Sequence, residues 1–440
     1  MACRSRTFFL YCLGCPKNEV DCDYLATALL RGGWSRCDRQ EDAAVIVINT
    51  CSFIVPAVEE SIEAILEMGD PEVKGDRRLV VTGCLVSRYG EDALTKLLPE
   101  VDLFVDFAHY TRFATTLEKM LEGKASHAED TFSREHASTL SRGYVYIKIA
   151  EGCGRKCTFC TIPAIRGPLR SRPWQEIREE ARFFLAGGAR EIILVAQDTT
   201  SYGLDIYGRR SLGPLLEKLC EEEGDWMLRV MYVHPQGVDD EFIRAMSHPR
   251  VQNYLDLPFQ HVDAKILAAM GRRGDADSYR KLLARAEEVM GDTAVRATFM
   301  VGFPGEDRDA LDSLYNFVAE MRFDWLGLFS YSQEENTAAF SLGKGSGATV
   351  IRRRIEKLSA IQEGIMREKA ADMVGRKLKV LVEGRSLEAP GFWEARSYRE
   401  APDIDGVIFM PHNKDLSSGS TYVASIVASE GIDLLGDLQP

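Results

Sequence analysis

Short apolar runs alternate with amphipathic stretches along the first quarter of the chain. The apolar runs have the length of buried strands and lie at residues 7–12, 43–49, 79–82 and 103–105. Between them, apolar residues recur with helical spacing, as at positions 58, 62, 65 and 66. Strand–helix–strand alternation is typical of a parallel sheet flanked by helices. We therefore predict a parallel α/β domain over residues 1–125.

The same alternation returns from residue 144 and continues through six strand-like runs. These runs lie at residues 144–149, 191–196, 227–233, 253–257, 294–301 and 325–330. Amphipathic segments of helical length separate them, and repeated right-handed βα units of this kind bend into an open (β/α)6 barrel. We predict this barrel over residues 143–370, after a polar linker at 126–142 that has no hydrophobic periodicity.

The last seventy residues follow a third pattern. A charged helical segment at 350–374 gives way to period-two runs, which lie at residues 377–382, 392–396, 406–410 and 421–427. Short strands punctuated by Gly, Pro, Asp and Ser are typical of a small closed antiparallel β-barrel. We place this barrel at 371–440, which makes the whole chain an α/β protein with a small β-barrel at its end.

Composition and charge indicate which class of partner the protein binds and in which cellular compartment it acts. The 440-residue chain has a formal net charge of −13 and contains no run of 18 apolar residues, so we expect no membrane span. Residues 370–440 alone carry seven basic and eleven acidic side chains, a balance that favours a basic protein partner over a phosphate backbone. Eleven cysteines without a signal peptide indicate reduced thiols, and hence a cytoplasmic protein.

Cysteines supply the first candidate chemistry. Cys153, Cys157 and Cys160 have a C-x3-C-x2-C spacing directly after the first strand of the predicted barrel. A structural zinc site normally closes with four protein ligands, whereas three thiolates on a [4Fe–4S] cluster leave one iron open to a small molecule. A zinc knuckle or three unrelated thiols is the alternative interpretation.

A second set of three cysteines is predicted at the edge of the N-terminal sheet. Cys15, Cys51 and Cys84 each follow the carboxyl end of a predicted strand, and in a parallel sheet these ends share one edge. We expect the three thiols to hold another [4Fe–4S] cluster; the alternative is three ordinary core cysteines. The cysteines without this placement are expected to be plain thiols, namely Cys3, Cys12, Cys22, Cys37 and Cys220.

The spacing at 153–160 resembles the signature of the radical S-adenosylmethionine (SAM) superfamily. The resemblance implies that the open iron binds SAM and cleaves it reductively to a 5′-deoxyadenosyl radical. Because catalytic groups in such barrels lie on loops after strands, we expect SAM contacts there. The candidates are Phe159, Gln197 and Gln260 on these loops, and Arg296 earlier on the fifth strand. His261 is a candidate for acid–base chemistry, with a purely structural role as the alternative.

Three longer segments extend the resemblance to nearly the whole chain. Residues 13–18 (LGCPKN), 162–173 (IPAIRGPLRSRP) and 195–203 (VAQDTTSYG) resemble the radical-SAM methylthiotransferases, in particular the branch that modifies a ribosomal protein. That family has an N-terminal three-cysteine domain, a radical-SAM barrel and a C-terminal TRAM barrel. Two positions depart from its pattern: Gly154 stands where relatives often have Asn, and residues 334–338 lack an expected Gly and Pro.

The resemblance implies two [4Fe–4S] clusters, two SAM molecules per turnover, and an electron donor such as flavodoxin or ferredoxin. The implied substrate is an aspartate of the twelfth small-subunit ribosomal protein, free or in the assembled subunit, which gains a methylthio group on Cβ. A tRNA adenosine methylthiotransferase with the same chemistry is the alternative, although the acidic C-terminal region makes tRNA the less favoured partner. A non-catalytic iron–sulfur carrier is a third possibility, and a complete barrel behind the cysteine loop argues against it.

Overall fold

The structure is a computed structural model that describes residues 6–122 and 134–438. The chain divides into two compact units. The N-terminal unit contains residues up to Ser138 together with 161–168, and the C-terminal unit contains 139–160 and 169–440. The predicted linker at 126–142 spans the boundary between them, and its residues 126–133 lie outside the described part of the chain.

A five-stranded parallel sheet forms the middle of the N-terminal unit, with strand order β2-β1-β3-β4-β5. The strands are β1 (Thr7–Cys12), β2 (Ser35–Arg36), β3 (Val45–Thr50), β4 (Arg78–Gly83) and β5 (Leu103–Val105). The helices are α1 (Pro16–Arg31), α2 (Val55–Gly69), α3 (Pro71–Lys74), α4 (Cys84–Tyr89), α5 (Glu91–Leu97) and α6 (Phe113–Glu122). The predicted parallel α/β domain is confirmed, with β2 as an additional short strand.

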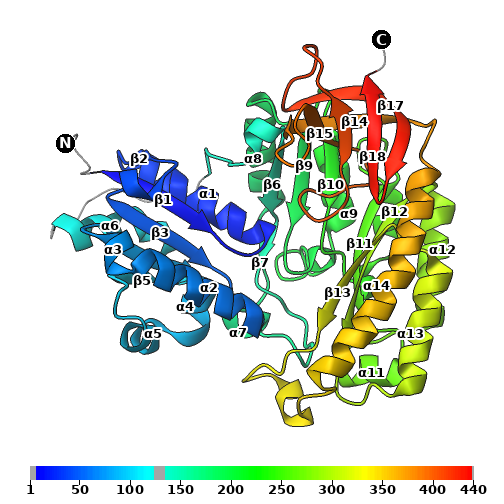
Figure 1. The fold of residues 1–440 in the computed structure, drawn as a ribbon, viewed down its shortest axis with the longest axis horizontal. Coiled ribbons are helices and arrows are strands. Elements are labelled where there is room, and N and C mark those ends of the chain that lie inside the picture. Colours follow the sequence, from blue (N-terminus) through cyan, green and yellow to red (C-terminus); the bar gives the residue numbers. More distant parts are fainter. Residues whose placement is uncertain (1–5, 123–133, 439–440) are drawn as a thin grey trace. The chain divides into compact units, whose positions relative to one another are not determined.

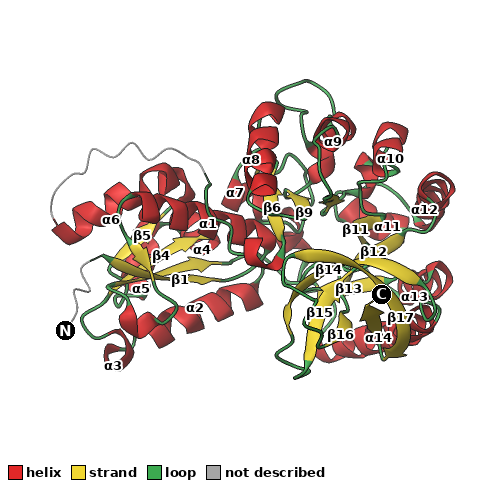
Figure 2. Ribbon diagram, turned by 90° about the horizontal axis from the view of Figure 1, so that it is seen from above, coloured by secondary structure: helices red, strands yellow, loops and turns green. Residues whose placement is uncertain are grey.

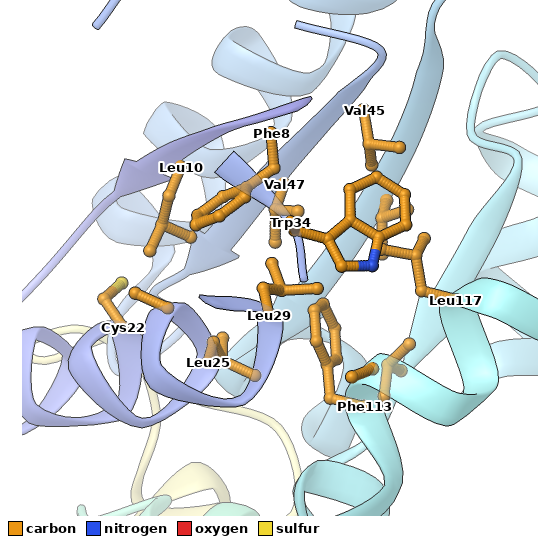
Figure 3. Packing of buried hydrophobic residues seen from close by; sticks show 14 of the residues in the cluster. Phe8, Leu10, Cys22, Leu25, Leu29, Trp34, Val45, Val47, Phe113 and Leu117 are labelled. Carbon is orange, nitrogen blue, oxygen red and sulfur yellow. The ribbon is translucent and has the colours of Figure 1, made fainter. Parts of the chain in front are cut away.

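Alternation along the strands gives this sheet two apolar faces, each covered by helices (Figure 2). On one face Phe8 and Val47 pack against Leu29 of α1 and Phe113 of α6 (Figure 3). On the other face the cluster includes Ile65 of α2 and residues of α4 and α5. Fully buried strands of this kind explain why the sequence shows continuous apolar runs here.

Six parallel strands organise the C-terminal unit (Figure 1). They are β6 (Tyr144–Lys148), β9 (Glu191–Val195), β10 (Met227–Val230), β11 (Tyr254–Gln260), β12 (Ala294–Val301) and β13 (Trp325–Ser330). The pairing runs β10-β9-β6 and β11-β12-β13. The two halves meet at a parallel bridge between Leu228 and Val251 and at the Val233 N–H, which donates to the Asp256 carbonyl at 2.9 Å.

Helices connect these strands in the order expected of an open (β/α)6 barrel. They are α8 (Trp174–Ala186), α9 (Leu212–Cys220), α10 (Asp240–Met246), α11 (Ala264–Ala269), α12 (Ala276–Met290) and α13 (Arg308–Met321), and α14 (Ala348–Ala371) follows the last strand. Strands β7 (Ala150–Glu151) and β8 (Arg170–Ser171) form a short antiparallel pair at the two ends of residues 152–169.

The chain ends in a closed β-barrel with strand order β14-β15-β16-β18-β17. Its strands are β14 (Lys377–Arg385), β15 (Phe392–Arg396), β16 (Ile408–Pro411), β17 (Ser420–Glu430) and β18 (Asp433–Leu438). The barrel is confirmed with one strand more than the sequence predicts. The pair β16–β18 is parallel, so the barrel is not antiparallel throughout.

Buried charges join the two barrels of the C-terminal unit. Arg229 on β10 is fully buried, and its Nε donates to Glu191 on β9 at 2.7 Å. Glu191 also accepts from Arg396 of β15 at 2.8 Å, and Arg229 donates to the carbonyls of Ser397 and Tyr398 at 3.0 Å. Burial alone would raise the pKa of Glu191, but the two arginines outweigh burial and hold it below its usual value.

In the described part of the chain, every helix is too short or too polar to cross a membrane.

Candidate functional site

The N-terminal cysteines occupy the carboxyl ends of three adjacent strands. Cys15 precedes α1, Cys51 follows β3, and Cys84 opens α4 directly after β4. A Cβ atom on Gly14 would lie 3.1 Å from the Cys51 sulfur, so the loops after β1 and β3 are in close contact. Burial, together with Cys51 and Cys15, raises the pKa of the Cys84 thiol to about 12, although Arg166 acts to lower it. The structure therefore brings the three predicted thiols into one neighbourhood.

Glycine allows these turns to be tight. Gly14 and Gly83 both have φ near +100°, a conformation that side chains disfavour. A Cβ atom on Gly83 would come within 2.4 Å of Asn49 Oδ1 and 2.6 Å of the Thr50 nitrogen. The residue before Cys84 must therefore be glycine for β4 to lie this close to β3.

A buried arginine that was not among the predicted site residues contacts the Cys84 thiol. Arg166 lies on α7 (Ile162–Arg166), within residues 161–168 of the N-terminal unit. Its guanidinium donates to Asp21 Oδ2 at 2.7 Å, to Asn18 Oδ1 at 2.5 Å and to the Cys84 sulfur at 3.3 Å. The guanidinium acts to lower the pKa of the Cys84 and Cys51 thiols, which favours their ionised, ligating form against the effect of burial. Its signal in the sequence was a single arginine on a short apolar helix.

The second cysteine set lies in the loop that follows β6 and β7. The Cys160 N–H donates to the Cys157 carbonyl at 3.2 Å, and both side chains pack against Phe159 in an apolar cluster with Phe303 and Tyr331. The Arg155 N–H donates to the Cys153 sulfur at 3.4 Å. The loop is thus held by its own backbone and by an apolar wall from β12 and β13.

Each set offers three thiols, a donor type suited to iron–sulfur clusters. Within residues 6–122 and 134–438, no three His, Cys, Asp or Glu side chains converge as they would on a single metal ion. A four-iron cluster separates its thiolates more widely than a single ion does. The N-terminal set has two half-buried thiols and one buried thiol, and all three thiols of the other set are half-buried. This partial exposure fits a group that must remain open on one side.

Arg155 links the cysteine loop to the loop after β9. Its Nε donates to Asp198 Oδ2 at 2.6 Å. Asp198 also accepts from the hydroxyls of Thr200 and Ser201, each at 2.6 Å. Burial acts to raise the pKa of Asp198, but Arg155, His234 and the two hydroxyl hydrogen bonds together outweigh burial and lower the pKa. An ionised Asp198 therefore fixes the orientation of Arg155 next to Cys153.

Gln197 and Gln260, predicted as SAM contacts, lie at strand ends as expected. Gln197 Nε2 donates to Glu151 Oε1 at 2.9 Å, while its Oε1 is buried without a hydrogen-bond partner among the described residues. Gln260 ends β11 with φ of +72°, where the register with β12 shifts. A buried acceptor and a strained strand end are features that a bound polar ligand would explain.

Two buried histidines follow neighbouring strands. His234 Nδ1 accepts the Gln236 N–H at 3.2 Å, and His261 Nδ1 accepts the Asp263 N–H at 3.0 Å. Burial lowers the pKa of His234 to about 3 and that of His261 to about 4, so both rings are neutral at pH 7. Each neutral ring must then carry its proton on Nε2, which has no hydrogen-bond partner among the described residues. His261 is therefore arranged as a hydrogen-bond donor; its predicted acid–base role would need a pKa closer to neutral pH.

Arg296, the remaining predicted SAM contact, forms an ion pair with the C-terminal barrel. It is the third residue of β12, far from the carboxyl end, and its Nη1 donates to Asp405 of the C-terminal barrel at 2.5 Å. Tyr254 donates to the same carboxylate at 2.6 Å. This ion pair gives Arg296 a role in packing between the two barrels, and its contact with SAM stays a prediction.

Comparisons with known proteins cover almost the whole chain. Residues 7–106 match the uncharacterized protein family UPF0004, residues 147–318 the radical SAM superfamily, and residues 374–438 the TRAM domain. The ribosomal protein uS12 methylthiotransferase RimO of Lachnoclostridium phytofermentans is 39% identical over 97% of this chain and 99% of its own length. The chain belongs to the RimO methylthiotransferase family. The RimO of Thermotoga maritima is 42% identical over 90% of this chain and 92% of its own length.

Solved structures agree with the fold of this RimO family member. A radical SAM methyltransferase, TsrM from Kitasatospora setae, superposes with a TM-score of 0.55 at 14% identity, over 74% of this chain and 73% of its own. Membership of the RimO family and of the radical SAM superfamily makes the chain an enzyme that uses an iron–sulfur cluster and SAM.

Proposed function

We propose that this enzyme transfers a methylthio group to Cβ of an aspartate in ribosomal protein uS12. Two observations support the proposal: full-length relatives carry this activity in their names, and a set of three thiols lies at strand ends in each of the two units. An aspartate Cβ–H bond is not acidic enough for a protein base, so the reaction needs a cofactor that removes a hydrogen atom.

The cofactor sites follow from the two cysteine sets. Cys153, Cys157 and Cys160 would hold the [4Fe–4S] cluster that, with SAM, supplies the hydrogen-abstracting radical. The N-terminal set, Cys15, Cys51 and Cys84, would hold a second [4Fe–4S] cluster as the site of the sulfur to be transferred. One SAM for the methyl group and one for the radical make two SAM molecules per turnover.

The chain's own side chains would position the reactants. Gln197 Oε1 is a buried acceptor that suits the amine of SAM, and His261 Nε2–H is a buried donor that suits a carboxylate. Phe159 contributes an apolar wall beside the cysteine loop. Neutral histidine binds a carboxylate without releasing a proton near neutral pH, so this contact does not change across the physiological range.

Charge favours a protein substrate over tRNA. The C-terminal barrel region is acidic, which attracts a basic ribosomal protein and repels a phosphate backbone. A ribosomal substrate, free or in the assembled subunit, places the reaction in the cytoplasm, where flavodoxin or ferredoxin supplies electrons. The tRNA adenosine reaction is the second candidate, because it would use the same two cysteine sets.

A comparison of cells with and without the gene distinguishes uS12 from tRNA as the substrate. Intact-mass spectrometry of uS12 is expected to show an increment of CH3S replacing H only when the gene is present, and tRNA nucleosides are expected to be identical in both strains. Loss of a methylthioadenosine, with uS12 unchanged, would overturn the proposed substrate.

Two single substitutions test the division of labour between the cysteine sets. Cys157→Ala is expected to abolish SAM cleavage while iron remains bound in the N-terminal unit. Cys51→Ala is expected to leave SAM cleavage intact and to stop formation of the methylthio product. A Cys51→Ala enzyme that still makes the product would refute the two-cluster assignment.

A further inference from the structure

Arg166 is a buried cation whose contacts join the N-terminal cysteines to α1. Its side chain is 2% exposed, and its partner Asp21 is equally buried. One Nη atom pairs with Asp21, while the other donates to both Asn18 and the Cys84 sulfur. The guanidinium plane also lies 3.8 Å from the centre of the Phe107 ring. Four partners on three segments hold the side chain in one orientation.

We propose that Arg166 is a positioning residue for the N-terminal cluster. Arg166 holds the Cys84 thiolate by a hydrogen bond and raises the reduction potential of the cluster. This inference rests on the proposed function only in taking that cluster to be present. It assigns a role to a residue outside both cysteine sets.

The direction of the effect follows from charge. A donor to a ligating sulfur withdraws electron density from the iron, so it favours the reduced cluster and raises the potential. Loss of the guanidinium would also remove the cation that lies 2.7 Å from the buried Asp21 carboxylate, so the negative charge beside the cluster would be less compensated. Both consequences lower the potential, so removal of Arg166 has a predictable sign.

The geometry further requires arginine. A lysine would keep the positive charge, but a single ammonium group cannot reach Asp21, Asn18 and the Cys84 sulfur in the planar arrangement that the guanidinium provides. Arg166→Lys is therefore expected to keep part of the effect, whereas Arg166→Gln removes the charge and most of the contacts.

The experiment isolates the N-terminal cluster in the full-length chain. Cys153, Cys157 and Cys160 are replaced by alanine, and the protein is reconstituted with iron and sulfide under anaerobic conditions. Potentiometric titration followed by electron paramagnetic resonance gives the midpoint potential, and resonance Raman spectroscopy gives the iron–thiolate stretching bands. Iron content and far-UV circular dichroism are measured on every variant.

Arg134 offers a matched control. It is a buried arginine of the same unit, and it pairs with Asp23 at 3.6 Å, two residues after Asp21 on α1. We expect Arg166→Gln to move the midpoint potential to more negative values and to shift the Raman bands. Arg166→Lys should give a smaller shift, and Arg134→Gln should match the parent. Iron loss in a folded Arg166→Gln protein, with iron retained in Arg134→Gln, would also support the role.

An Arg166→Gln protein with the parent's iron content, midpoint potential and Raman bands would overturn the inference while leaving the proposed function intact. If Arg166→Gln does not fold, Arg166→Lys decides: parental values in that variant overturn the inference as well. A parent protein that holds no iron would instead refute the N-terminal cluster, and with it both proposals.

Discussion

Gly83 is the position where one added methyl group has the most predictable effect on the N-terminal site. Gly83 and Gly90 bracket α4, and both have positive φ, +100° and +81°. A Cβ atom on Gly83 would meet Asn49 and Thr50 within 2.6 Å, whereas one on Gly90 would have no described atom within 4 Å. The pair therefore separates steric overlap from backbone strain.

The two substitutions share one cost and differ in another. Gly90→Ala forces alanine into a conformation that costs about 1–3 kcal/mol. Gly83→Ala incurs this strain and adds overlap with the backbone of β3, and overpacking of this kind costs about 1–3 kcal/mol more. That difference corresponds to a roughly 5- to 150-fold change in an opening equilibrium.

Hydrogen exchange measured by mass spectrometry on the full-length chain reads this difference locally. Peptides that cover β4 should exchange faster in Gly83→Ala than in Gly90→Ala by that factor, and peptides from the C-terminal barrel should match the wild type. Equal acceleration in the two variants would refute the reasoning, because it would mean that the space beside Thr50 is not limiting.

Further substitutions test the C-terminal unit. Arg229→Met removes one of the two arginines that pair with the buried Glu191 and takes a donor from the Ser397 and Tyr398 carbonyls, which should cost about 3–5 kcal/mol. The control Arg280→Ala, at an exposed ion pair, should cost under about 1 kcal/mol, and exchange rates across β10 and α12 check both values. His261 stays neutral in the folded protein, so the unfolded chain is protonated first as the pH falls below 6.5. The free energy of unfolding should therefore drop by up to about 3 kcal/mol as the pH approaches 4. Urea titrations should show a smaller drop for His261→Gln. Arg296→Met should lower the melting temperature, because it removes the cationic partner of the buried Asp405 carboxylate. We expect the dissociation constant for SAM to stay unchanged in this variant, and a weaker affinity would support Arg296 as a SAM contact.

Hydrophobic periodicity predicted the larger elements well because each buries a continuous face. The predicted runs at 7–12 and 103–105 coincide with β1 and β5. Strand β2 has two exposed residues and no pattern to detect. Strand β18 is interrupted by Gly436 and Asp437, so it resembles a turn in the sequence. Its parallel pairing with β16 depends on barrel closure, which no local pattern encodes.

Some residues of the candidate site could likewise be predicted from the sequence, and others could not. Thiols at strand ends could be predicted, because the carboxyl ends of parallel strands share an edge. Arg166 could not, because it contacts Cys84 from 82 positions away and reaches it through a helix that the sequence assigns to the other domain. The ion pair of Arg296 with Asp405 could not be predicted either, because the two residues are 109 positions apart and meet only where the two barrels pack together.

The discontinuity of the N-terminal unit bears on how the chain folds during synthesis. The sheet and its flanking helices are complete by residue 122, but α7 emerges from the ribosome only after residue 166 has been added. Until then, the buried position beside Asp21 lacks its cation, and the unit should remain a late, loosely closed intermediate. By that stage all six cysteines that are predicted to be cluster ligands have been translated. A fragment that ends at residue 138 would remain in this state, so an isolated N-terminal unit must also include residues 161–168 to close fully.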